Sequence, residues 1–189
     1  MDSDVRFLHE IQKLFGTVTL ETSSYYSKSN EIYLYIIDKP PICFAAKSSN
    51  SFEVGNPNRT RIHLIAIDQG LDNFLEDYTG KRPEGILLNK NDLCFIELKL
   101  NVVSQNSITQ TQRVEEAIEQ FDNFIPYLKN RFNELSNNFM RLGFDKYEAY
   151  VVLPSSRYPR FSASTAIRKL AFGKRHGIEL FETNLKVFQ

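Results

Sequence analysis

The stretch that most constrains the fold is residues 82–99, which read RPEGILLNKNDLCFIELK. Together with Leu100, which follows it, this stretch provides two mostly apolar runs of strand length, 84–88 and 93–100. Between them, residues 89–92 are of types that favour tight turns. The stretch therefore predicts two antiparallel strands that lie side by side in one sheet.

Three charged residues stand out within this predicted hairpin. Glu97 and Lys99 are two positions apart on a strand, so their side chains point to the same face. Their neighbours are strongly apolar, and a charged pair is costly to bury there unless it is paired or binds a metal. Glu84 begins the preceding strand, which the turn brings back alongside Glu97. The sequence therefore predicts that two carboxylates meet at one point beside Lys99.

Two carboxylates can hold Mg²⁺ or Mn²⁺, because such ions keep several waters as their other ligands. The metal bound by Glu84 and Glu97 would polarise a phosphoryl oxygen and lower the pKa of a bound water. Lys99 would orient or deprotonate the attacking water, or neutralise charge that develops on the phosphate. We therefore take Glu84, Glu97 and Lys99 as the candidate catalytic residues.

The order Pro83-Glu84, a short hairpin and then Glu97-Leu98-Lys99 resembles the PD-(D/E)xK nuclease superfamily, over a core of about residues 60–153. More loosely, the whole chain resembles the small stand-alone bacterial members. The resemblance implies a restriction-endonuclease-like α/β fold, in which helices flank a mixed central sheet. It also implies metal-dependent cleavage of phosphodiester bonds.

The resemblance also points to further site residues. The first acid of the family pattern is usually Asp, whereas this chain has Glu84, whose extra methylene must shift the metal or the backbone. Asp68 or Asp77 is an alternative source of that acid. In many members a helix after the lysine strand brings a Gln or Glu near the site, and here the candidates are Gln112 and Gln120.

Apolar periodicity predicts the other elements. A long helix should start near Ser107 or Thr109 and carry one apolar face from Val114 to Phe132, with Pro126 kinking or splitting it. Strands alternating with helices favour an α/β class, and because no linker is evident we expect 1–189 to be a single domain. The other expected elements are helices at 4–15 and 164–172, strands at 31–38, 42–47, 61–68 and 146–154, a loop or hairpin end at 21–30, and a terminal hairpin of 178–181 with 185–188.

The overall charge balance is neutral, with 23 basic and 23 acidic residues, which argues against a general nucleic-acid coat protein. Residues 150–189 nevertheless hold seven Lys or Arg against two Glu. Such a local excess can contact phosphates. The expected nucleic-acid contacts are Arg157, Arg160, Arg168 and Lys169.

Cys43 and Cys94 each lie in an apolar run, which favours core packing over a zinc site. No signal peptide or 18-residue apolar span is evident, so we expect a cytoplasmic protein with reduced thiols and no membrane partner.

The function predicted from the sequence is a Mg²⁺- or Mn²⁺-dependent nuclease that acts on DNA in preference to RNA. Two alternatives stay open: a catalytically inactive nuclease-fold module for binding or assembly, and a protein-interaction or immunity-type protein. A homodimer is also left open, because cutting both strands of a duplex needs two active sites.

Overall fold

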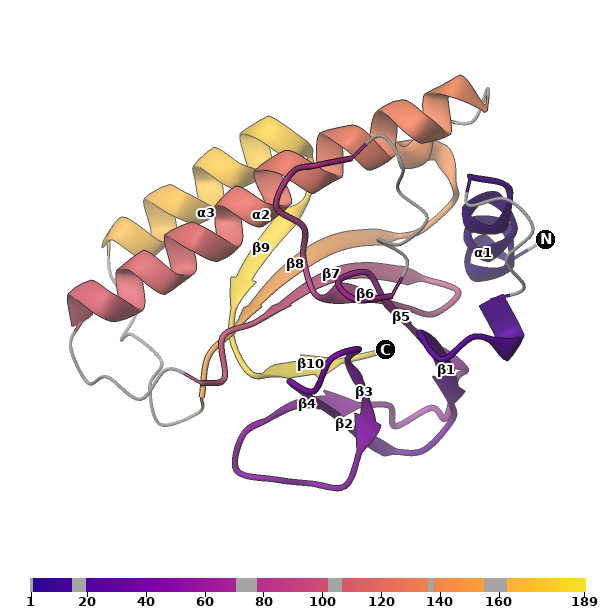
Figure 1. The fold of residues 1–189 in the computed structure, drawn as a ribbon, viewed down its shortest axis with the longest axis horizontal. Coiled ribbons are helices and arrows are strands. Elements are labelled where there is room, and N and C mark those ends of the chain that lie inside the picture. Colours follow the sequence, from indigo (N-terminus) through magenta and orange to yellow (C-terminus); the bar gives the residue numbers. More distant parts are fainter. Residues whose placement is uncertain (1, 15–19, 71–77, 102–106, 136–137, 155–162) are drawn as a thin grey trace.

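A computed structural model of the chain shows a fold of three layers (Figure 1). A six-stranded sheet forms the middle layer, helices cover one of its faces, and a four-stranded sheet covers the other. The structure describes residues 2–14, 20–70, 78–101, 107–135, 138–154 and 163–189. The chain is therefore α/β, as the sequence predicts, but helices flank the central sheet on one side only.

The six-stranded sheet is mixed, with the order β1-β5-β6-β7-β8-β9. Its first four strands pair antiparallel, whereas β7, β8 and β9 pair parallel. The predicted hairpin is confirmed, since Gly85 pairs with Ile96 and Leu88 with Leu93. The strands are β1 (Tyr26–Ser29), β5 (Ile62–Ala66), β6 (Gly85–Leu88), β7 (Asp92–Leu98), β8 (Lys146–Val152) and β9 (Glu179–Glu182).

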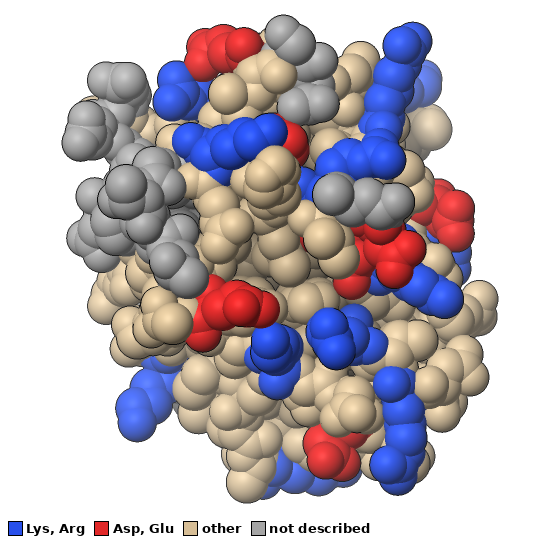
Figure 2. All heavy atoms as spheres, turned by 90° about the vertical axis from the view of Figure 1, so that its right-hand side faces the viewer, with Lys and Arg blue, Asp and Glu red and all other residues tan. Residues whose placement is uncertain are grey.

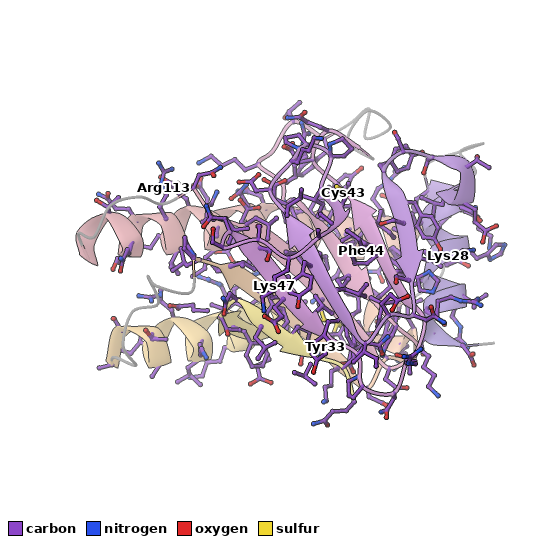
Figure 3. The ribbon with its side chains drawn as sticks, turned by 90° about the horizontal axis from the view of Figure 1, so that it is seen from below. Lys28, Tyr33, Cys43, Phe44, Lys47 and Arg113 are labelled. Atoms are coloured by element: carbon purple, nitrogen blue, oxygen red, sulfur yellow. The ribbon has the colours of Figure 1, made fainter. Side chains whose placement is uncertain are left out.

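The four-stranded sheet has the order β10-β4-β2-β3. Figure 3 looks onto its side of the molecule, with Tyr33, Cys43, Phe44 and Lys47 labelled. Its strands are β2 (Tyr33–Ile37), β3 (Cys43–Ala45), β4 (Ser51–Gly55) and β10 (Leu185–Val187).

The sequence of strand β7 is apolar without alternation because both faces of the strand are buried. Leu93 and Phe95 face the core beneath the helices, whereas Cys94, Ile96 and Leu98 face the core shared with the second sheet. All seven residues of β7 are buried because both faces of the sheet are covered. The prediction of a core position is confirmed for Cys94, whereas Cys43 is only half-buried.

The helices pack through aromatic side chains. They are α1 (Ser3–Leu14), α2 (Ser107–Glu134) and α3 (Ala163–His176), with short 3-10 turns η1 (Leu20–Thr22) and η3 (Phe139–Arg141). The rings of Phe7 on α1 and Phe132 on α2 stack with centroids 5.5 Å apart. Among the described helices, none combines the length and apolarity that a membrane crossing requires.

Two predicted features are wrong because long-range pairing overrides the local pattern. The C-terminal strands do not form a hairpin: β9 joins β8 in the first sheet, whereas β10 joins β4 in the second. The expected loop at 21–30 contains β1, which pairs with β5. Strand β4 was not predicted at all.

Pro126 does not split the long helix, because α2 continues through it from Ser107 to Glu134. Proline removes one backbone donor, but the buried Phe124, Ile125 and Leu128 around it anchor that part of the helix in the core. Packing therefore outweighs the local penalty of proline here.

Candidate active site

Glu84 and Glu97 lie opposite one another where β6 begins and β7 ends. The backbone N–H of Glu84 donates to Oε2 of Glu97 at 3.0 Å. Gly85, which follows Glu84, permits the close approach of β5 on the other side of β6, since a Cβ there would lie 2.6 Å from the carbonyl oxygen of Ile65. The predicted approach of the two glutamates is thus built by the hairpin register.

Lys99 lies beside Glu97 and is also held by α2. Its Nζ is 2.6 Å from Oε1 of Glu97 and donates to Oε1 of Gln120 at 3.1 Å. The Gln120 amide in turn donates to the carbonyl oxygen of Arg82 at 2.9 Å. One side chain of α2 therefore ties the lysine to the segment that precedes Glu84.

The two glutamates share a site that disfavours negative charge. Burial is the main reason that the pKa of Glu84 rises to about 8, and the charge of Glu97 raises it further. Burial also raises the pKa of Glu97, which the neighbouring Lys99 partly offsets. Glu84 therefore holds a proton at neutral pH when no cation is present, and a bound cation would favour its release.

Asp38 and Asp68 lie near enough for their charges to raise the pKa of Glu84. Asp68 pairs with Nε of Arg82 at 3.2 Å, and Asp38 accepts a hydrogen bond from the amide of Asn101 at 2.8 Å. Asp68 was predicted only as an alternative first acid, whereas Asp38 was not predicted. Asp38 comes from the second sheet, so only the packing of the two sheets brings it to this site.

The donor set suits a cation held by few protein ligands. Among the described residues no three His, Cys, Asp or Glu side chains assemble a metal cage. The Glu97 carboxylate accepts hydrogen bonds from Lys99, from the backbone N–H of Glu84 and from the Gln120 side chain, so of its roughly four lone-pair sites one stays open for a cation. No described residue donates a hydrogen bond to the Glu84 carboxylate. Glu84 and Glu97 thus fit an ion such as Mg²⁺ that keeps waters in its shell.

The other predicted site residues lie away from Lys99, outside the described residues or in the C-terminal tail. Gln112 is exposed on α2, two turns before Gln120, and no hydrogen bond links it to Lys99. Asp77, Arg157 and Arg160 lie outside the described residues. In the described part of the tail, Arg168 pairs with the side chain of Glu182 at 2.9 Å, and Lys169 lies over the ring of Phe181. Nucleic-acid contact by Arg168 and Lys169 stays a prediction.

Comparison with known proteins adds no relative from which a role could be transferred. No family model matches the chain, and searches of curated proteins and of solved structures returned no match.

Proposed function

We propose that this protein is a metal-dependent nuclease that cleaves phosphodiester bonds of DNA, with a restriction-endonuclease-like core. The observation that carries the proposal is the grouping of Glu84, Glu97 and Lys99 at the open end of one hairpin, in contact with Gln120. Two carboxylates next to a lysine supply a cation site and a positive charge for one phosphate.

Each residue then has a distinct role. Glu84 and Glu97 hold Mg²⁺ or Mn²⁺, and the ion supplies an activated water and a Lewis acid when it is bound. Lys99 faces the same point and stabilises negative charge on the phosphate or takes part in proton transfer with the water. Gln120 fixes the position of the Lys99 ammonium and contacts Arg82 at the other side of the site.

Plasmid cleavage with Mg²⁺ or Mn²⁺ tests the proposal. We expect cleavage by the wild type and loss of at least about 100-fold in rate for Lys99→Ala, by analogy with the loss of a preorganised charge. If Lys99 acts through charge alone, Lys99→Arg retains part of the activity. If it exchanges a proton, Lys99→Arg is as inactive as Lys99→Ala, because a guanidinium keeps its proton. Equal cleavage by wild type and Lys99→Ala would refute the proposal.

A second candidate, a module of the same fold that binds without cutting, is favoured by one observation. The side chain of Glu97 is only 1% exposed and is engaged by Lys99. A wild type that binds oligonucleotides but neither binds Mn²⁺ calorimetrically nor cleaves would support this candidate. Mn²⁺ binding that Glu97→Ala abolishes, in a protein that remains folded, would support the nuclease.

A further inference from the structure

A second cluster of cations lies at the opposite end of the hairpin from Glu84 and Glu97. It lines a cavity of about 570 Å³ between the start of α1, the end of β1, the β4–β5 connection and the β6–β7 turn. Figure 2 shows the face with α1 and β1, where Lys and Arg side chains lie close to one another. The cations are Lys28, Arg59, Arg61 and Lys90, and the acids are Asp2 and Asp4.

Three of these four cations are free to take an external anion. No carboxylate of the described residues lies within ion-pair distance of Arg59, Arg61 or Lys90, and all three are exposed. Lys28 pairs with Glu21 at 3.1 Å, but both side chains are about half exposed or more, and such surface pairs contribute little. The cavity lining therefore carries more positive than negative charge. A bound anion would relieve the repulsion between these cations.

A buried asparagine shapes the β4–β5 connection that bears the two arginines. Asn56 is fully buried. Its amide donates to the carbonyl oxygens of Thr60 at 2.8 Å and Glu31 at 3.1 Å, and its Oδ1 accepts the N–H of Thr60 at 3.0 Å. Arg59 within this loop has φ 51°, a left-handed conformation that is unfavourable for a residue with a side chain. The loop is thus held in one conformation.

A second buried asparagine joins that loop to the turn that bears Lys90. Asn89 is fully buried, and its Oδ1 accepts the N–H groups of Asn91 and Asp92, both at 2.8 Å. Its amide donates to Oγ1 of Thr60 at 3.4 Å. The backbone positions that bear cations in two separate loops are therefore fixed next to each other before any ligand binds, which lowers the entropy that the loops lose on binding.

We propose that this cavity binds phosphate groups. Its volume accommodates a phosphate with the sugar or second phosphate attached to it. Two arginines suit phosphate recognition, because each guanidinium can donate two parallel hydrogen bonds to phosphate oxygens. The phosphates can belong to a nucleic-acid backbone or to a free phosphorylated molecule. The cavity lies roughly 20 Å from Glu84, because Lys90 follows Glu84 by six residues and an extended chain rises about 3.3 Å per residue.

Binding without divalent metal tests this proposal separately from cleavage. Fluorescence anisotropy is measured with a labelled duplex and with its single strand, and calorimetry is measured with inorganic pyrophosphate. The test variant is Arg59→Ala with Arg61→Ala. The charge-matched control is Lys47→Ala with Arg141→Ala, two exposed cations outside the cavity lining and outside the basic tail. Arg59→Lys with Arg61→Lys retains the charge but loses the two-pronged geometry.

For a nucleic-acid backbone, we expect the test variant to lose on the order of 10-fold in duplex affinity at low salt. The slope of log K against log salt should fall by about two units, one for each lost phosphate contact. The Lys variant should fall between the wild type and the Ala variant, and the control should match the wild type. Loss of pyrophosphate binding alone would assign the cavity to a free phosphorylated molecule.

Three results would overturn the proposal: no binding of any probe by the wild type, equal affinity of wild type and test variant for every probe, or equal losses in the test and control variants. Circular dichroism of each variant checks that the fold is retained. Cleavage is not read out, so an inactive hairpin site would leave this result interpretable.

Discussion

At the scale of single residues, the candidate active site is a balance between burial and charge. Glu84 has no hydrogen-bond donor to its carboxylate among the described residues, whereas Glu97 is engaged by Lys99 and by the N–H of Glu84. Burial disfavours the charge of both glutamates. A site with these properties should respond to pH, to cations and to the loss of the Gln120 side-chain amide.

The raised pKa of Glu84 predicts how stability depends on pH without metal. The pKa is about 8 in the folded protein against an ordinary value of 4.5. In the window between them, the folded state holds a proton that the unfolded state has released. The free energy of unfolding should therefore fall as pH rises through this window, by at most about 5 kcal/mol, and then level off. Glu84→Gln should remove that part of the decline.

Urea unfolding in the presence of a chelator across this window measures the effect. Glu179→Gln, at an exposed glutamate of β9, is the matched control and should behave as the wild type does. Added Mg²⁺ should stabilise the wild type most at the alkaline end, because protons compete with the cation for Glu84. An identical pH dependence in wild type and Glu84→Gln would contradict the raised pKa.

Gln120 offers a second residue-scale prediction. Gln120→Leu removes the acceptor for Lys99 and the donor to Arg82 while keeping similar bulk on α2. We expect cleavage to slow by about 10- to 100-fold, as for other groups that orient the residues of a metal site. Gln112→Leu on the exposed face of the same helix should cleave at the wild-type rate. Wild-type cleavage by Gln120→Leu would exclude Gln120 from positioning Lys99.

At the scale of elements, a buried ion pair links helix α3 to strand β9. Nε and Nη2 of Arg168 donate to Oε1 of Glu182, and Nη2 also donates to Oε2 at 2.9 Å. The side chain of Glu182 is 2% exposed, so its charge depends on this partner. An arginine predicted to contact nucleic acid thus has a structural contact as well.

Arg168→Ala should therefore destabilise the fold. We expect about 3 kcal/mol, because the change leaves a buried carboxylate without its partner. Lys169→Ala, which removes a neighbouring cation on the same helix, should cost well under about 1 kcal/mol. Arg168→Met combined with Glu182→Leu should recover most of the loss. Urea unfolding measures all three, and an unchanged midpoint for Arg168→Ala would argue against this role.

At the scale of the whole molecule, a buried charge cluster joins the two sheets. Lys186 on β10 pairs with Asp92 on β7 at 2.7 Å and with Glu148 on β8. The Tyr150 hydroxyl and the Cys94 thiol also donate to Glu148, and the three charged side chains are all less than 10% exposed. Strand β10 is therefore held in the second sheet by backbone pairing with β4 and to the central sheet by this charge cluster.

Lys186→Met should loosen this attachment. Two carboxylates would remain buried without their cation, which costs about 3–5 kcal/mol in comparable cases. Lys174→Met, at an exposed lysine of α3, is the control and should be near neutral. Urea unfolding gives the loss, and faster labelling of the buried Cys94 in a Cys43→Ser background shows that the sheets separate. A Lys186→Met protein as stable as the wild type would disprove the lock.

The sequence by itself determined the hairpin and the common face of Glu97 and Lys99. Turn chemistry at 89–92 and the two-residue repeat of a strand act over neighbouring positions, so no distant partner is needed. The apolar face of α2 is likewise a local pattern, although its tertiary packing carried the helix through Pro126.

Only the tertiary structure determined which distant residues join these local elements. It selected Gln120 over Gln112, brought Asp38 near Glu84, separated β9 from β10, and placed Lys90 beside Arg59. These juxtapositions depend on the pairing of strands and the stacking of sheets between segments far apart in the chain. Local residue propensities cannot predict such contacts, because their free energy comes from apolar surface buried between the layers.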